Sequence, residues 1–111
     1  MSMEDLVNKR CVPCEGEVQS LKGDKLLRYI EQIDDWQVID EHHLIKNFKF
    51  SDFKTALQFV NKVGEIAEQE NHHPDISLSW GKVEITLFTH AIDGLSENDF
   101  ILARKIDLIE N

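Results

Sequence analysis

The chain is poor in the residues that mark several classes of protein. Its two cysteines are too few for a disulfide framework in 111 residues. No apolar run approaches the roughly 20 residues of a membrane-spanning helix. Residues 1–10 include Glu4 and Asp5 and no apolar block, so they lack the pattern of a secretory signal. We therefore expect a soluble, cytoplasmic protein that does not bind a membrane.

Basic residues are scarce relative to acidic ones. The sequence has 12 Lys and Arg against 21 Asp and Glu, a formal net charge of -9. This balance argues against a nucleic-acid partner, because binding to the phosphate backbone needs a basic surface, but it leaves contact with a basic protein open. A hydrophobic share of 41% and a charged share of 30% are typical of a folded globular chain of one domain.

Residues 1–19 differ in pattern from the rest, being polar and without a sustained period. We interpret them as a polar N-terminal arm followed by a single domain over residues 20–111. The arm contains the CxxC motif Cys11-Val12-Pro13-Cys14, outside the strand-to-helix context of a thioredoxin-type site. Inert thiols, a redox pair and half of a zinc site remain open, and His42 and His43 are the spare ligands that such a zinc site would need.

From residue 20 onward, segments with a helix period alternate with segments with a strand period. Ser20 and Ser51 are candidate N-caps, and Ser96 with Asp99 has the spacing of a capping box. The expected helices cover residues 20–33, 52–70 and 97–109, and the expected strands cover residues 36–39, 44–50, 76–80 and 83–88. The order α-β-β-α-β-β-α predicts an α+β fold, a four-stranded antiparallel sheet with helices packed on one face.

Two helices have notable apolar faces. The first is expected to bury one face, formed by Leu26, Leu27, Ile30 and Ile33. The last helix has apolar residues around more than half of its circumference, at Phe100, Ile101, Leu102, Ala103, Ile106, Leu108 and Ile109. In the expected strand of residues 83–88, Phe88 also points to the opposite face from the core residues. Burial on two sides is therefore expected, and we predict a homo-oligomer.

Three of the five histidines are expected to meet at one edge of the sheet. His72 and His73 lie where the long helix ends and the second hairpin begins, and His90 lies where the last strand ends. Antiparallel pairing places the start of one strand beside the end of its neighbour. Glu68 lies one helical turn before His72, and Asp99 lies in the first turn of the last helix.

This set of residues is suited to acid/base chemistry on a neutral small molecule. Imidazoles exchange protons near neutral pH, and neighbouring carboxylates fix their tautomers. Trp36 and Trp80 could wall a planar ligand or belong to the core. The histidines could also be surface residues, and Asp99 could serve only as a cap. Adjacent histidines rarely share one ion and no HExxH spacing is present, so no metal is predicted.

The same residues carry a family resemblance over about residues 20–109. The run Glu68-x-x-x-His72-His73-Pro74, followed by Trp80, His90 and Asp99, resembles the signature of the pterin-4a-carbinolamine dehydratases. Residues 48–53 resemble the family's F-x-F-x-D-F, and Thr89-His90 with residues 94–99 resembles its TH…GLSE-x-D. Trp80 stands where many members have tyrosine, and the CxxC arm resembles an extension found in some longer members.

The resemblance implies dehydration of 4a-hydroxytetrahydropterin to quinonoid dihydropterin, which recycles the pterin used by aromatic amino acid hydroxylases. It implies a homodimer or homotetramer and no metal or organic cofactor. His72 and His90 would transfer protons, and His73 would hold the pterin or share the acid role. The supporting set would be Glu68, Pro74, Trp36, Trp80, Thr89 and Asp99. Some relatives also act as dimerisation partners of a homeodomain transcription factor, so a coactivator role or a non-catalytic pterin binder is the alternative.

Overall fold

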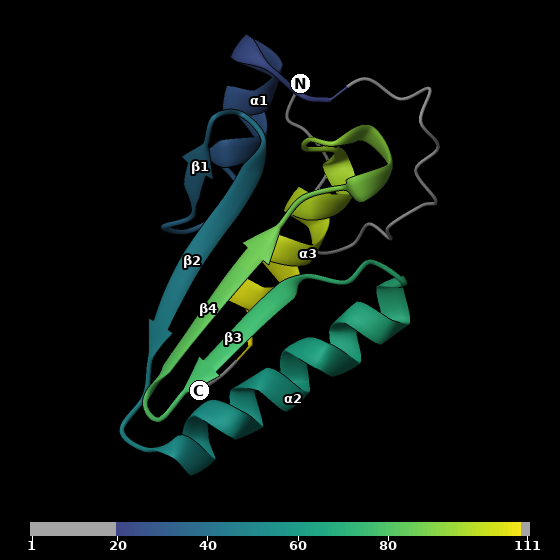
Figure 1. Cartoon of the computed structure of the whole chain (residues 1–111). Helices are drawn as coiled ribbons and strands as arrows, with labels where there is room; N and C mark the ends of the chain where they lie inside the picture. The colour runs from purple at the N-terminus through teal and green to yellow at the C-terminus, as the bar shows by residue number, and fades with distance from the viewer. Residues whose placement is uncertain (1–19, 110–111) are drawn as a thin grey trace.

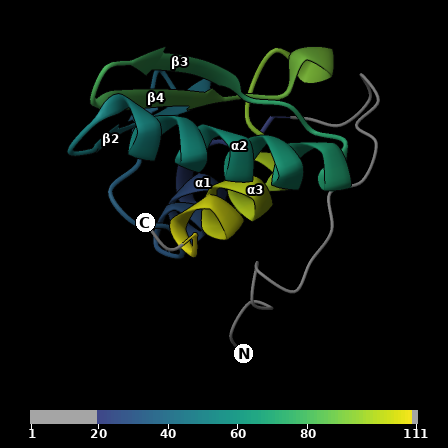
Figure 2. The same ribbon diagram turned by 90° about the horizontal axis from the view of Figure 1, so that it is seen from below.

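A computed structural model describes residues 20–109 as an antiparallel sheet covered by helices on one face (Figures 1 and 2). The elements in order are α1 (Gly23–Ile30), β1 (Gln37–Ile39), β2 (His43–Lys49), α2 (Phe53–Glu70), β3 (Asp75–Ser79), β4 (Lys82–Leu87), the 3-10 helix η2 (His90–Ile92) and α3 (Glu97–Asp107). The predicted fold class and order are confirmed. The predicted arm, including Cys11 and Cys14, lies outside the described residues.

The sheet has the strand order β1-β2-β4-β3, and every neighbouring pair is antiparallel. Alternate residues of β4 face the helices, so Val83, Ile85 and Leu87 are fully buried. Leu44 of β2 pairs with Leu87 and is buried with it. Because β4 lies between β2 and β3, it contributes the centre of the core (Figure 1).

The N-cap of the long helix α2 lies one residue later than predicted. Asp52, rather than Ser51, is the N-cap, and its Oδ1 accepts a hydrogen bond from the backbone N–H of Thr55 at 2.7 Å. Hydrogen bonds from Thr55 hold the pKa of the Asp52 carboxyl below its usual value. The helix ends at Glu70, and its C-cap Asn71 has a φ of 52°, in the left-handed region that asparagine tolerates. This ending turns the chain toward β3.

The last helix is buried within the chain itself. Ser96 and Asp99 form the predicted capping box, and the helix ends at Asp107 rather than at residue 109. It packs against α1 and α2, and its buried apolar residues are Phe100, Ile101, Leu102, Ala103 and Ile106. The wide apolar surface that we took as a sign of an oligomer interface is thus largely covered by the chain's own helices.

The first helix buries most of the predicted face, with one exception at Leu27. It begins at Gly23 rather than near Ser20, and Leu27 is 56% exposed. Tyr29 is buried instead, because it lies with Leu26 on the side of α1 that meets the core, where Ile33 beyond the helix is buried too. The Tyr29 hydroxyl donates a hydrogen bond of 2.8 Å to Glu97 Oε2 at the start of α3. This bond ties the first helix to the last.

Tyr29 is expected to ionise well above the usual pH. Burial, and then the hydrogen bond to Glu97 and its charge, raise the pKa of Tyr29 from 10.0 to about 12. Because the unfolded chain loses this proton first, the free energy of unfolding should fall as the pH rises from 10.0 to about 12. Tyr29 is the only tyrosine, so an ultraviolet titration reports it alone. A midpoint near 10.0 in protein that circular dichroism shows to be folded would contradict this expectation.

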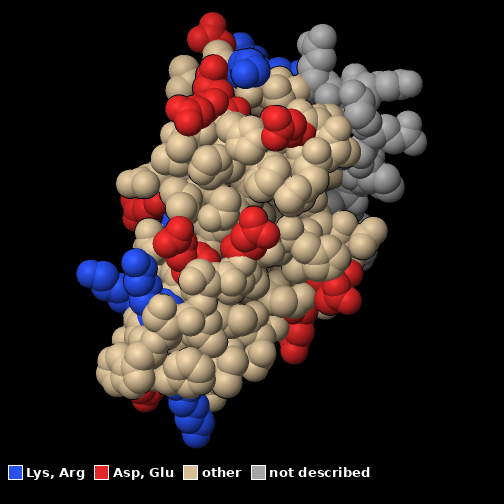
Figure 3. All heavy atoms as spheres, viewed as in Figure 1, with Lys and Arg blue, Asp and Glu red and all other residues tan. Residues whose placement is uncertain are grey.

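The surface of the described residues agrees with the acidic composition. On the face seen in Figure 3, Lys and Arg lie in separate groups rather than in one continuous basic patch. Among the described residues, no helix combines the length and apolar character needed to cross a membrane.

Candidate active site

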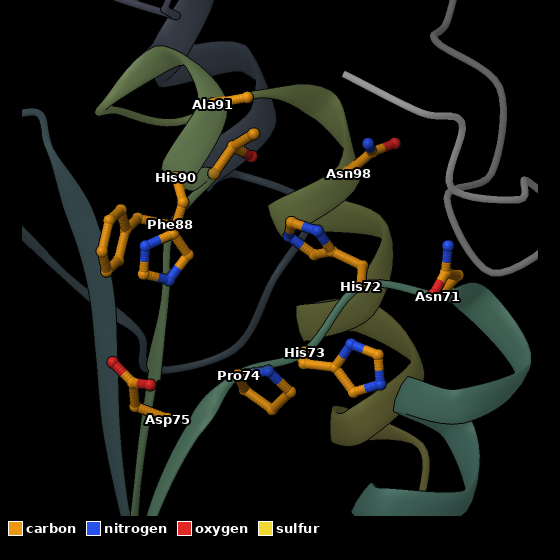
Figure 4. Close-up of a pocket in the computed structure, with 10 residues that line it drawn as sticks. Asn71, His72, His73, Pro74, Asp75, Phe88, His90, Ala91 and Asn98 are labelled. Carbon is orange, nitrogen blue, oxygen red and sulfur yellow. The ribbon is translucent and has the colours of Figure 1, made fainter. Parts of the chain in front are cut away.

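The residues predicted to converge surround one hollow. Its volume is about 390 Å³, within the range of small-molecule sites. Three segments far apart in the sequence line it (Figure 4). They are the link from α2 into β3 (residues 71–75), the segment that follows β4 and begins η2 (residues 88–91), and Asn98 at the start of α3. His72, His73 and His90 are all among the lining residues.

The strand pairing brings these segments together. Asp75, the first residue of β3, pairs with Thr86 near the end of β4, so the chain before β3 lies beside the chain after β4. Thr89 and Gly94 exchange backbone hydrogen bonds and close the short loop that contains η2. The end of α2 is held by an ion pair in which Lys105 Nζ donates to Glu70 Oε2 at 2.7 Å. This ion pair joins α2 to α3 close to His72.

Asp99 joins the cap of α3 to the site. Its carboxylate is fully buried, and its Oδ1 lies 2.6 Å from His72 Nε2. Its Oδ2 accepts hydrogen bonds from the Thr89 hydroxyl at 2.8 Å and from the Ser96 backbone N–H at 2.9 Å. Thr89 is also buried and lies 2.7 Å from the Ser96 hydroxyl. Asp99 therefore caps the helix and orients His72 at the same time.

This pairing determines the tautomer of His72. A carboxylate accepts a hydrogen bond, so Nε2 must carry the hydrogen that lies between His72 and Asp99. Neutral His72 then has no hydrogen on Nδ1, which makes that nitrogen a proton acceptor. The buried carboxylate would also stabilise the imidazolium that forms when Nδ1 takes a proton. The pair is thus suited to general base chemistry.

His73 has a looser partner. Its Nε2 contacts Oε2 of Glu68, which lies two residues before the end of α2. Their side chains are 55% and 77% exposed, so the pair orients the ring but stabilises the fold little. Pro74 follows at the same rim and lines the hollow. Glu68, expected to reach the histidine pair, contacts His73.

His90 is held in a different way. Within residues 20–109, no hydrogen bond or ion pair holds its ring. The Phe88 ring lies against it instead, with the centroids 4.1 Å apart. Phe88 lines the hollow and was missed as a site residue by sequence reasoning, as was Asn98. Phe88 directly follows the buried Leu87, so in an extended chain its side chain points to the opposite face of the sheet. This alternation was the signal that could have identified Phe88 as a site residue.

Trp36 and Trp80, expected either as walls of a planar ligand or as core residues, are not among the residues that line the hollow. Trp36 is 7% exposed, and its Nε1–H donates to Asp107 Oδ1 at 2.9 Å. Trp80 is 68% exposed in the turn between β3 and β4, at the opposite end of these strands from the histidines. Their places depend on strand register and helix packing, which residue type alone does not reveal.

His, Cys, Asp and Glu side chains are the usual protein ligands of metal ions. Across the part of the chain that the structure describes, no three His, Cys, Asp or Glu side chains are arranged so that they could hold a metal ion. His42 and His43 lie next to each other, with their Nδ1 atoms 3.1 Å apart, and His42 is bound to Asp93.

Comparisons with known proteins point to one family. A family model described as pterin 4 alpha carbinolamine dehydratase matches residues 19–109. A protein of Rubrobacter xylanophilus, provisionally named a pterin-4-alpha-carbinolamine dehydratase, is 56% identical over 105 residues, which cover 95% of this chain and 98% of its own. A similarly named protein of Alkaliphilus metalliredigens is 54% identical over 106 residues, or 95% of this chain and 96% of its own.

A solved structure agrees with this result. The crystal structure of a transcriptional coactivator/pterin dehydratase from Brucella melitensis matches with a TM-score of 0.74 and 32% identity. The match covers 79% of this chain and 95% of that one. The sequence and structural comparisons thus lead to the same family.

Proposed function

Because the chain belongs to the pterin 4 alpha carbinolamine dehydratase family, we propose that it is a hydro-lyase that converts 4a-hydroxytetrahydropterin to quinonoid dihydropterin. The observation that carries the proposal is the convergence of His72, His73 and His90 on one hollow. Its volume of about 390 Å³ suits a flat bicyclic molecule. The dihydropterin product would be recycled to the tetrahydropterin that aromatic amino acid hydroxylases consume.

The reaction needs one proton delivered and one removed. The bond between C4a and its hydroxyl oxygen breaks, and the oxygen leaves as water once it has gained a proton. A ring N–H loses a proton, so the net change is the loss of one water molecule. General acid–base groups in hydrogen-bond reach of both positions accelerate such a step.

The hydrogen bonds at the site suggest which histidine takes which role. His72 donates through Nε2 to Asp99, so its Nδ1 would accept the proton from the ring nitrogen. His90 would donate to the leaving hydroxyl, since it is the remaining imidazole not bound to a carboxylate in the described part of the site. His73, oriented by Glu68, would hold the pterin or share the acid role. Thr89 would act through Asp99, and Pro74 would form part of the wall.

Stopped-flow dehydration tests the proposal directly. Freshly generated 4a-hydroxytetrahydropterin should lose water at a rate that rises linearly with added protein. The control is an equal concentration of the heat-denatured chain. A rate equal to that in buffer, with protein that circular dichroism shows to be folded, would overturn the proposal.

We also propose that the chain forms a homodimer or homotetramer. With α3 buried in the chain, the exposed apolar residues that remain include Phe53 and Leu57, one turn apart on α2. Sedimentation velocity at micromolar concentration should show a species larger than the 12.9 kDa chain. A single 12.9 kDa species would contradict this expectation.

A further inference from the structure

Three rings form a continuous stack at the edge of the hollow. The Phe88 ring lies between two imidazoles, with its centroid 4.1 Å from that of His90 and 4.9 Å from that of His42. The planes are tilted by 44° and 36°, respectively. His42 comes from the turn between β1 and β2, and Phe88 and His90 follow β4, so the stack joins two separate parts of the sheet edge.

The far end of the stack is fixed by polar contacts. His42 Nε2 lies 2.7 Å from Asp93 Oδ1, and its Nδ1 lies 3.1 Å from His43 Nδ1. Asp93 belongs to the same short loop as His90 and follows η2 directly. His42 is therefore anchored to the loop that carries His90, and Phe88 is held between the two rings.

The histidines of the hollow differ in what orients them. His72 and His73 each contact a carboxylate, whereas the described residues provide His90 with an aromatic neighbour and no hydrogen bond to its ring. His90 is exposed, and an exposed side chain without a partner samples several rotamers. In Figure 4 the Phe88 ring lies on the side of His90 turned away from His72. Phe88 therefore limits the movement of His90 away from the hollow.

We propose that Phe88, backed by His42, is the positioning residue of His90, replacing the carboxylate that orients each of the other two histidines. This inference rests on the proposed function, in which His90 delivers a proton to the substrate. A ring held by aromatic contact keeps both nitrogens available for substrate. Its direction then depends on a flat neighbour, because edge and face contacts between rings have preferred geometries.

The test compares Phe88→Leu with Phe88→Tyr. Leucine keeps an apolar side chain but removes the flat ring, while tyrosine keeps the ring. We expect Phe88→Leu to lower kcat for dehydration by about tenfold with KM changed by less than about twofold, since misplacing a reacting group costs rate rather than binding. Phe88→Tyr, which keeps the ring, should have a kcat within about twofold of that of the wild type. Leu27→Ala, at an exposed apolar residue of α1, is the control for lost apolar surface and should leave kcat unchanged.

Nuclear magnetic resonance of the imidazole groups provides a measurement that does not depend on activity. The His90 ring signals, assigned by their absence in His90→Gln, should lose the ring-current shift in Phe88→Leu and keep it in Phe88→Tyr. Unchanged His90 signals or an unchanged kcat in Phe88→Leu would overturn the proposal. If the wild type does not dehydrate the pterin, the proposed function fails, and the His90 signals still decide whether Phe88 orients the ring.

Discussion

Replacing His72 or His90 by alanine is expected to lower kcat for dehydration by about 10²–10⁴-fold, the usual contribution of a general acid or base. Both rings line the hollow, and the proposed reaction needs a proton acceptor and a proton donor. Because the two would act on one step, the double variant should lose little more than the worse single variant. Stopped-flow single turnovers with saturating protein measure this rate constant.

Two controls separate chemistry from structure in this experiment. His72→Gln keeps an N–H that can donate to the buried Asp99 but cannot accept a proton at neutral pH, so it should be folded and as slow as His72→Ala. Asn47→Ala changes an exposed side chain on β2 and should match the wild type. Wild-type rates in both His72→Ala and His90→Ala would refute the assignment.

Asp99 is expected to affect both stability and rate. Asp99→Ala would leave the Thr89 hydroxyl, the Ser96 N–H and His72 Nε2 without their shared acceptor, and it should lower the free energy of unfolding by about 3 kcal/mol. Asp99→Asn is more informative about rate. Its amide N–H₂ can face His72 Nε2, which would move the imidazole hydrogen to Nδ1 and block the proposed base. We expect kcat to fall about 10²–10⁴-fold in this variant.

Asp107 provides the matched control for Asp99. It is also an aspartate of α3 with a buried side chain, and its carboxylate accepts hydrogen bonds from the Trp36 Nε1–H, Lys46 Nζ and the Asp34 backbone N–H, away from the hollow. Asp107→Asn should therefore destabilise the chain in a urea titration but leave kcat within about twofold of the wild type. Wild-type kcat in Asp99→Asn would show that Asp99 serves only as a helix cap.

The element order was predictable because the local patterns and the tertiary contacts agree. The hairpins alternate with period two, and α2 has both a strong apolar stripe and a clear stop at Asn71. Antiparallel topology then brings His72, His73 and His90 to one edge, whatever the packing details. Ser96 and Asp99 were recognisable as a capping pair from their spacing alone.

The features that the sequence did not predict depend on packing between helices and strands. In the two-turn helix α1, Leu26 and Leu27 are both apolar, and only the position of the core decides that Leu27 is exposed. Lys46 has the inward parity of β2, which the structure accommodates because Asp107 and the Asp34 carbonyl accept its hydrogen bonds. Phe88 faces away from the core, so its role depends on a turn more than 40 residues earlier in the chain, at His42.

The central claim is that one hollow, between His72, His73 and His90, binds the pterin. A crystal structure with an unreactive dihydropterin tests it most directly. We predict density for the bicyclic ring in that hollow, with C4a and the ring nitrogens within hydrogen-bond reach of His72 and His90 or of a water between them. A pterin bound elsewhere on the chain, or an empty hollow in crystals grown with saturating ligand, would contradict it.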